Sequence, residues 1–149
     1  MTYSHSSLEA YRTCPFKFKL QYLDRVKKEK REGIEAFLGS TVHDTLEKLY
    51  KDLLHTKLST LQELLIYYNT TWDKNWHDAI VITKTGLNKE HYRTSGEECI
   101  KSYYNRYQPF NQAKTMKIEE SLNFHLDHEK KHSFTGFMDR LDQAGDGTY

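Results

Sequence analysis

The stretch KTMKIEESLNFHLDHEKKHSFTGFMDRLD, residues 114–142, decides the fold. Apolar and polar residues alternate in two runs, from Met116 to Leu126 and again from Phe134 to Met138. A period of two is typical of β-strands. The polar segment DHEKKH, residues 127–132, lies between the runs and predicts a turn. We therefore predict a β-hairpin. The following AGDGTY, residues 144–149, predicts a second turn and, at Thr148, the start of a third strand.

Residues 1–112 carry helical periodicity instead. One helix is predicted from about residue 7, with Ser6 and Glu9 as a capping box, and it breaks and restarts at Pro15. Further helices are predicted over 36–54, after Ser59 or Thr60, and over 90–107. The stripe expected to face the core of the long helix consists of Val42, Leu46, Leu49 and Leu53. The fold class is α+β, in which N-terminal helices precede the hairpin and the start of a third strand.

The bulk composition excludes several classes of protein. The chain of 149 residues has 22 Lys and Arg against 21 Asp and Glu, a net charge of +1, so no global basic field marks a nucleic-acid binder. No apolar run approaches the roughly 20 residues of a membrane span. The N-terminus lacks the apolar segment of a secretory signal. We therefore expect one cytoplasmic domain, helical over 1–112 and with core strands over 113–149.

His43 is the first candidate for metal chemistry. His43 and Glu47 are four residues apart on the predicted long helix, so their side chains lie on one face, one turn apart. Near the edge of the buried face, the imidazole is placed to bind a metal. The alternative is a half-buried structural histidine paired with Glu47, and spacing alone favours that alternative.

Acidic residues of the hairpin are the second group. On a strand from Gly136 to Asp142, Asp139 shares a face with Phe137 and Leu141, where a carboxylate is costly unless a cation or metal pairs with it. An ion pair with a packed helix is the equal alternative. Of Glu119 and Glu120, one must point toward the helices. One histidine and two or three carboxylates suit Mg²⁺ or Mn²⁺ and predict phosphodiester hydrolysis.

The N-terminal helices carry two further candidates. Lys17 and Lys19 alternate with aromatic residues in CPFKFKLQY, a pattern that fits a grip on a nucleic-acid strand and equally a helix with snorkelling lysines. Cys14 and Cys99 are too few for a four-thiolate metal site within this chain, and reduced buried thiols are the simpler interpretation.

Four segments, in order, resemble the nuclease domain of RecB-like and AddB-like proteins, within the PD-(D/E)XK superfamily. They are SHSSLEAYRTCPFKFKLQYLDRV (4–26), GIEAFLGSTVHDTLEKLY (33–50), MKIEESLNFHL (116–126) and FTGFMDRLDQAGDGTY (134–149). Each motif is loose, but four in this order and spacing are fairly specific. The resemblance implies a restriction-endonuclease-like core, a Mg²⁺- or Mn²⁺-dependent deoxyribonuclease activity in recombination, repair or defence, DNA as the partner, and a helicase fused or recruited.

Individual residues acquire expected roles from that resemblance. His43 matches the metal-binding histidine and Glu47 the glutamate that supports it in catalysis. Glu119 matches a recurrent strand glutamate, and Asp139 matches the first acidic metal ligand and a catalytic residue. Arg140 belongs to the same DRLD run, and we expect it to contact DNA together with Lys17 and Lys19.

The same resemblance predicts what lies beyond Tyr149. The family continues into a strand with a (D/E)-x-K motif, whose carboxylate and lysine complete the catalytic set, so we expect a truncated core and a chain that is inactive alone. Cys14 matches a ligand of the 4Fe-4S cluster found in a subset of the family, which requires further cysteines downstream. The competing hypotheses are a non-catalytic helical module that binds single-stranded DNA or a helicase, and a plain helical interaction protein.

Overall fold

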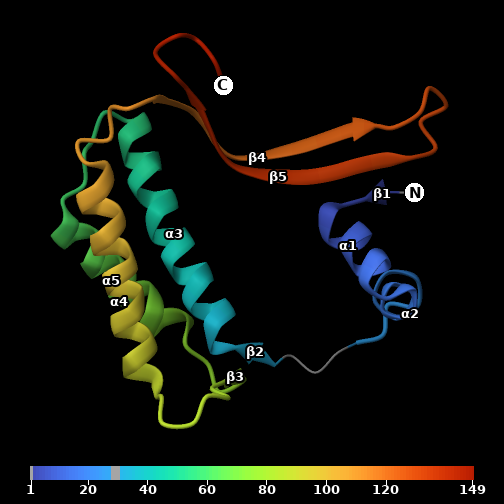
Figure 1. Cartoon of the computed structure of the whole chain (residues 1–149), viewed down its shortest axis with the longest axis horizontal. Coiled ribbons are helices and arrows are strands. Elements are labelled where there is room, and N and C mark those ends of the chain that lie inside the picture. The colour runs from blue at the N-terminus through green and yellow to red at the C-terminus, as the bar shows by residue number, and fades with distance from the viewer. Residues whose placement is uncertain (1, 28–30) are drawn as a thin grey trace. The chain divides into compact units, whose positions relative to one another are not determined.

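The computed structural model describes residues 2–27 and 31–149, and these divide into two compact units (Figure 1). The first unit comprises 2–27 together with 119–140, and the second comprises 31–118 together with 141–149. Helices occupy most of the chain before residue 108, and the two long strands follow, which confirms the predicted α+β class and the order of its elements.

The second unit is built on three helices, α3 (Ile34–Leu54), α4 (Leu61–Asn75) and α5 (Lys89–Tyr107), which all contact one another (Figure 1). Two short parallel strands, β2 (Glu32–Gly33) and β3 (Ile80–Val81), accompany them. Capping boxes start two of the helices. Thr60 accepts from the backbone of Glu63 before α4, and Asn88 accepts from that of His91 before α5, so orphan amide donors are satisfied at both starts.

Aromatic and aliphatic side chains fill the core between these helices. Its fully buried apolar members are Ile34, Leu49, Leu64, Tyr68, Trp72 and Ile100. Of the stripe predicted on α3, Leu49 is buried, but Val42, Leu46 and Leu53 are only half-buried. Thr41 and Thr45 are buried instead. Each threonine hydroxyl donates to a carbonyl one turn earlier, at 2.9 Å, which satisfies it inside the core. The buried stripe is therefore rotated from the predicted one.

Gly96 sets how closely α5 approaches its neighbours. A Cβ atom at this position would lie 2.0 Å from the hydroxyl oxygen of Tyr68 on α4 and 2.7 Å from Cδ1 of Leu38 on α3. The Tyr68 hydroxyl donates to the carbonyl oxygen of Arg93 at 3.2 Å, and burial raises the pKa of this phenol. Only a residue without a side chain permits this packing.

The first unit begins with β1 (Thr2–Tyr3), α1 (His5–Thr13), α2 (Pro15–Phe18) and a short π-helical turn η1 (Lys19–Leu23). The break at Pro15 is confirmed, and Pro15 opens α2. The predicted first capping box is wrong. Ser4 caps α1 and exchanges hydrogen bonds with Ser7, because a serine at the third helical position can replace the usual glutamate, so the helix begins two residues earlier.

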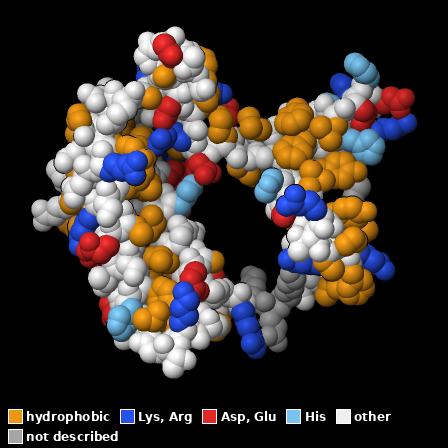
Figure 2. Space-filling view, in the orientation of Figure 1, with side chains coloured by type: hydrophobic (Ala, Val, Ile, Leu, Met, Phe, Trp, Pro, Cys, Tyr) orange, Lys and Arg blue, Asp and Glu red, His pale blue; other side chains and the backbone are white. Residues whose placement is uncertain are grey.

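The hairpin pairs β4 (Lys114–His125) with β5 (Ser133–Gln143), as predicted. At its turn, Asp127 accepts the amide hydrogens of Lys131 and His132 at 2.9 and 2.7 Å. These hydrogen bonds from backbone amides lower the pKa of the Asp127 carboxyl, and the bond from Lys131 has the largest effect. Figure 2 shows hydrophobic side chains along the hairpin and charged and histidine side chains at its tip.

The third strand of the sheet is not where the sequence predicted it. The sheet order is β1-β5-β4, and β1 runs parallel to β5, with Thr2 opposite Ser133 and Tyr3 opposite Phe134. Thr148 instead closes a turn, in which its amide donates to Asp146 at 3.0 Å and its carbonyl accepts from Ala144 at 2.8 Å. The local hydrogen bonds of Asp146 compete with strand pairing there.

Candidate metal centre

Glu119 and Asp139 form an acidic pair on neighbouring strands of the hairpin. Glu119 lies on β4 and Asp139 on β5, and a carboxylate oxygen of one lies within 4.8 Å of a carboxylate oxygen of the other. Two like charges at this separation disfavour each other unless a cation lies with them. Both side chains are exposed, so an ion from solvent can reach them. Paired carboxylate oxygens are the donor set that Mg²⁺ and Mn²⁺ prefer.

The backbone of Glu119 is unusual for a strand residue. Its φ is 52°, in the left-handed region, whereas a strand requires extended backbone. Such a residue interrupts the alternation of side chains, as in a β-bulge, and bulges re-aim side chains near functional sites. Glu119 is exposed and Glu120 half-buried, so of the two glutamates it is Glu120 that points inward. The sequence offered no signal for this, because glutamate is not a residue that favours positive φ.

The surroundings of Asp139 differ from those that the sequence predicted. Asp139 was expected on a buried apolar face, yet it is exposed, and Phe137 on the same side of the strand is 75% exposed. Leu122 and Phe124 on β4, and Leu126 just after it, are likewise 42 to 54% exposed. Burial of the side chain therefore does not single out Asp139 among the described residues. Its proximity to Glu119 does.

His43 lies on the exposed side of α3, within a second group of possible ligands. Ligand atoms of His43, Asp44 and Glu47 lie within 4.8 Å of one another. Asp44 and Glu47 are half-buried. Glu47 also forms an ion pair with Lys51, one turn further along the helix, so it is not simply the partner of a structural histidine. The predicted i, i+4 arrangement of His43 and Glu47 is present, on the face next to the buried threonine stripe.

The candidate DNA-binding lysines differ in their surroundings. Lys17 lines a small pocket of about 310 Å³ between α1 and the α2–η1 segment. Lys19 lies 3.9 Å from the carboxylate of Asp24, a long and exposed ion pair. Arg140 is exposed on β5, next in sequence to Asp139.

Cys14 has a structural role in the first unit. It is the N-cap of α2, where its sulfur accepts the amide hydrogen of Lys17 at 3.4 Å. It is partly exposed, and Cys99 on α5 is exposed. Both thiols are free, as expected, but neither is buried. The cap accounts for a small polarizable residue before Pro15 without a cluster.

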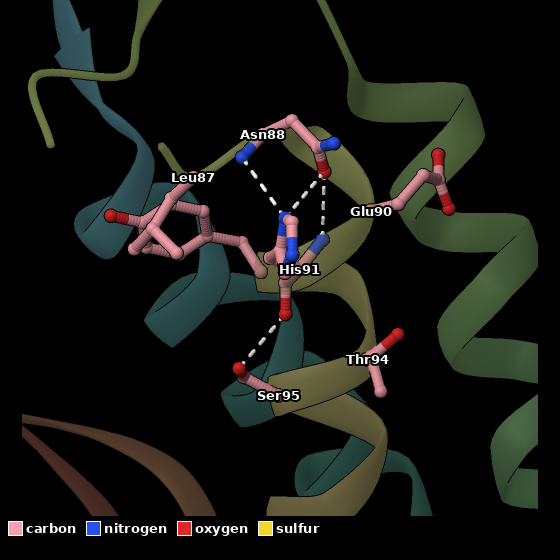
Figure 3. A pocket seen from close by; sticks show the side chains of 7 residues that line it. Leu87, Asn88, Glu90, His91, Thr94 and Ser95 are labelled. Atoms are coloured by element: carbon pink, nitrogen blue, oxygen red, sulfur yellow. Dashed lines mark hydrogen bonds between the residues drawn. The ribbon is translucent and has the colours of Figure 1, made fainter. Parts of the chain in front are cut away.

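A pocket at the start of α5 was not predicted. It has a volume of about 490 Å³, and its lining residues are Leu87, Asn88, Glu90, His91, Tyr92, Thr94 and Ser95 (Figure 3). The His91 ring is held by Asn88, whose side-chain oxygen lies 2.9 Å from Nδ1, and the Ser95 hydroxyl donates to the His91 carbonyl (Figure 3). Asn88, His91 and Ser95 are thus hydrogen-bonded to one another (Figure 3).

Comparison with known proteins identifies the family. The model of the PD-(D/E)XK nuclease superfamily matches residues 2–149. Nucleases of this superfamily act on nucleic acids and generally use divalent metal ions. No curated protein matches the chain. Among the described residues, no helix combines the length and the apolar character that crossing a lipid bilayer requires. Because the family match extends over almost the whole sequence, the chain belongs to the PD-(D/E)XK nuclease superfamily.

Proposed function

We propose that this chain belongs to a metal-dependent deoxyribonuclease of the RecB-like type, which hydrolyses DNA phosphodiester bonds in recombination, repair or defence. The observation that carries the proposal is the pair of carboxylates from Glu119 and Asp139 on adjacent strands of a nuclease-superfamily hairpin. The proximity of the two carboxylates supports the proposal, and so does the positive φ of Glu119, because strained backbone is common at functional positions.

The proposed ligands of Mg²⁺ or Mn²⁺ are Asp139, Glu119 and His43. Two hard carboxylate oxygens with one imidazole fit either ion, and the imidazole favours Mn²⁺. A divalent ion bound there would lower the pKa of water and offset charge on the scissile phosphate. Glu47 is proposed to orient the His43 imidazole, because a ligating histidine usually has a carboxylate or carbonyl at its second nitrogen. The DNA backbone is proposed to be held by the positive charges of Lys17, Lys19 and Arg140.

The hydrolysis test uses the protein as its gene encodes it, with Mg²⁺ and a fluorescent single-stranded or duplex oligonucleotide. Asp139→Asn removes one ligand charge while it keeps the shape of the side chain, so we expect hydrolysis to fall by at least about 100-fold. The matched control is Asp78→Asn, which removes an exposed carboxylate from a loop of the second unit and should leave the rate unchanged.

Two results would overturn the proposal. One is Mg²⁺-dependent hydrolysis that persists in Asp139→Asn at the wild-type rate. The other is DNA binding by the wild-type protein with no hydrolysis under any divalent ion, which would identify a non-catalytic DNA-binding module instead.

A further inference from the structure

We propose that the outer face of α5 binds single-stranded DNA by stacking a base against Tyr107 while Arg106 contacts the adjacent phosphate. This inference rests on the proposed function only in taking DNA as the polymer, and it assigns a contact surface separate from the metal ligands. The surface is a shallow groove of about 480 Å³, lined by Glu98, Cys99, Ser102, Tyr103, Arg106 and Tyr107.

The two tyrosines form a fixed aromatic platform. Their rings, one helical turn apart, have centroids separated by 4.6 Å and are tilted by 46°. The Tyr103 hydroxyl lies 2.7 Å from the hydroxyl of Tyr50 on α3, and Gln112 donates to the carbonyl of Tyr107 at 2.8 Å. Both rings are half-buried against the core of the second unit, and both residues line the groove. A preorganised ring loses little entropy when a base stacks on it.

Arg106 supplies an available positive charge beside that platform. Its guanidinium lies 5.3 Å from the centroid of the Tyr107 ring, a cation–π arrangement, and the side chain is exposed. Among the described residues, no carboxylate forms an ion pair with Arg106. The acidic residue of the groove, Glu98, is already paired with Lys101 at 2.8 Å. Lys101 also lies 3.7 Å from Glu97, so this lysine is shared between two carboxylates, and Arg106 is the positive charge of the groove that can contact a phosphate.

The combination favours a single strand over a duplex or a peptide. A base must expose its flat face to stack on Tyr107, and in a duplex those faces are already stacked on one another. An acidic peptide would satisfy Arg106 but would leave the ring without a planar partner. Aromatic rings with an arginine beside them are the elements by which proteins bind single strands without reading their sequence.

The test measures binding of fluorescein-labelled dT12 to the 149-residue chain by fluorescence anisotropy in EDTA, so that no metal contributes. Tyr107→Leu retains an apolar side chain but removes the ring, and Tyr107→Phe retains the ring as its matched control. Arg106→Gln removes the guanidinium, and Lys74→Gln, which removes an exposed lysine of α4, is the control of equal charge. Circular dichroism verifies that each variant is folded.

We expect Tyr107→Leu to raise the Kd for dT12 by about 10-fold, with Tyr107→Phe unchanged. Arg106→Gln should reduce the slope of log Kd against log salt concentration by about 0.7, the value for one phosphate contact on a single strand, while Lys74→Gln leaves it unchanged. An abasic oligomer of equal length should bind the wild-type chain as weakly as dT12 binds Tyr107→Leu.

Folded Tyr107→Leu and Arg106→Gln variants that bind dT12 as the wild-type chain does would overturn the inference. So would a wild-type chain that prefers duplex DNA or an acidic peptide to dT12. Failure of the proposed nuclease function is distinguished by the readout, because Asp139→Asn is scored by metal-dependent hydrolysis, whereas Tyr107→Leu and Arg106→Gln are scored by binding in EDTA, where no hydrolysis occurs.

Discussion

Gly96→Ala should destabilise the second unit, because the new methyl group has no room. Its Cβ would lie 2.0 Å from the Tyr68 hydroxyl oxygen, 2.6 Å from Cζ of the same ring and 2.7 Å from Cδ1 of Leu38. Contacts below 3.0 Å require atoms to move, and Tyr68 is fully buried among core side chains. Overpacking of this kind costs about 1–3 kcal/mol.

Two smaller effects act on the same substitution. Displacing Tyr68 weakens its 3.2 Å hydrogen bond to the Arg93 carbonyl, a loss of about 1 kcal/mol. Alanine is in turn a better helix former than glycine by about 1 kcal/mol. These two effects nearly cancel, so the net loss in the free energy of unfolding is about 1–3 kcal/mol. For a chain of this size each kcal/mol lowers Tm by about 2–4 °C.

Urea unfolding followed by circular dichroism measures this loss. The matched control is Gly39→Ala on α3, whose Cβ meets no atom within 4 Å, so this variant should be more stable than wild type by up to about 1 kcal/mol. Tyr68→Phe removes the closest clashing atom, and the double variant should therefore lose less stability than the sum of the two single variants. A Gly96→Ala chain as stable as the Gly39→Ala control would refute the packing argument.

Two further predictions follow from local geometry. Glu119→Gly should raise the free energy of unfolding by about 1 kcal/mol, because φ of Glu119 is 52° and glycine adopts such a backbone without strain. Glu120→Gly, on extended backbone, should lower the free energy of unfolding. Urea unfolding compares the two variants, and equal losses of stability would contradict the left-handed backbone at Glu119. Burial raises the pKa of Asp52, but the hydrogen bonds from Lys48 and Ser59 outweigh it and lower the pKa below 3.8. A lowered folded-state pKa contributes stability that is present above the unfolded pKa and is lost as pH falls through the folded one. Asp52→Asn should therefore lose less stability than the wild type as the pH falls from about 5 into the acid range. Parallel losses in the two chains would contradict this assignment.

Periodicity and end signals predicted most of the helices. The hydroxyl residues before an apolar run predicted Ser59 or Thr60 as a cap, and in the structure Thr60 is the cap, with Glu63 as its partner. The burial of Thr41 and Thr45 on α3 was not predicted, because threonine counts as polar in a hydrophobic pattern. In the structure each hydroxyl donates to a backbone carbonyl of the same helix. Whether a threonine can be buried depends on that local hydrogen bond, which hydrophobic patterning does not represent.

The sheet was predictable where its pairing is local. The hairpin joins strands separated by a short polar turn, and alternation is a sufficient signal for it. The pairing of Thr2 and Tyr3 with Ser133 and Phe134 spans almost the whole chain, and two residues are too few to show any period. For the candidate site, Asp139 was identified by an argument about burial that its exposure does not support. The proximity of Glu119 to Asp139 depends on the register between β4 and β5, which the sequence pattern does not specify.

Mn²⁺ binding by the 149-residue chain, followed by the loss of the free Mn²⁺ signal in electron paramagnetic resonance, tests the proposed metal centre most directly. We expect one Mn²⁺ bound per wild-type chain, binding weakened by at least about 10-fold in Asp139→Asn, Glu119→Gln and His43→Ala, and no change in Asp78→Asn. Equal Mn²⁺ affinity in the wild-type chain and in Asp139→Asn would contradict the assignment of these carboxylates as a metal site.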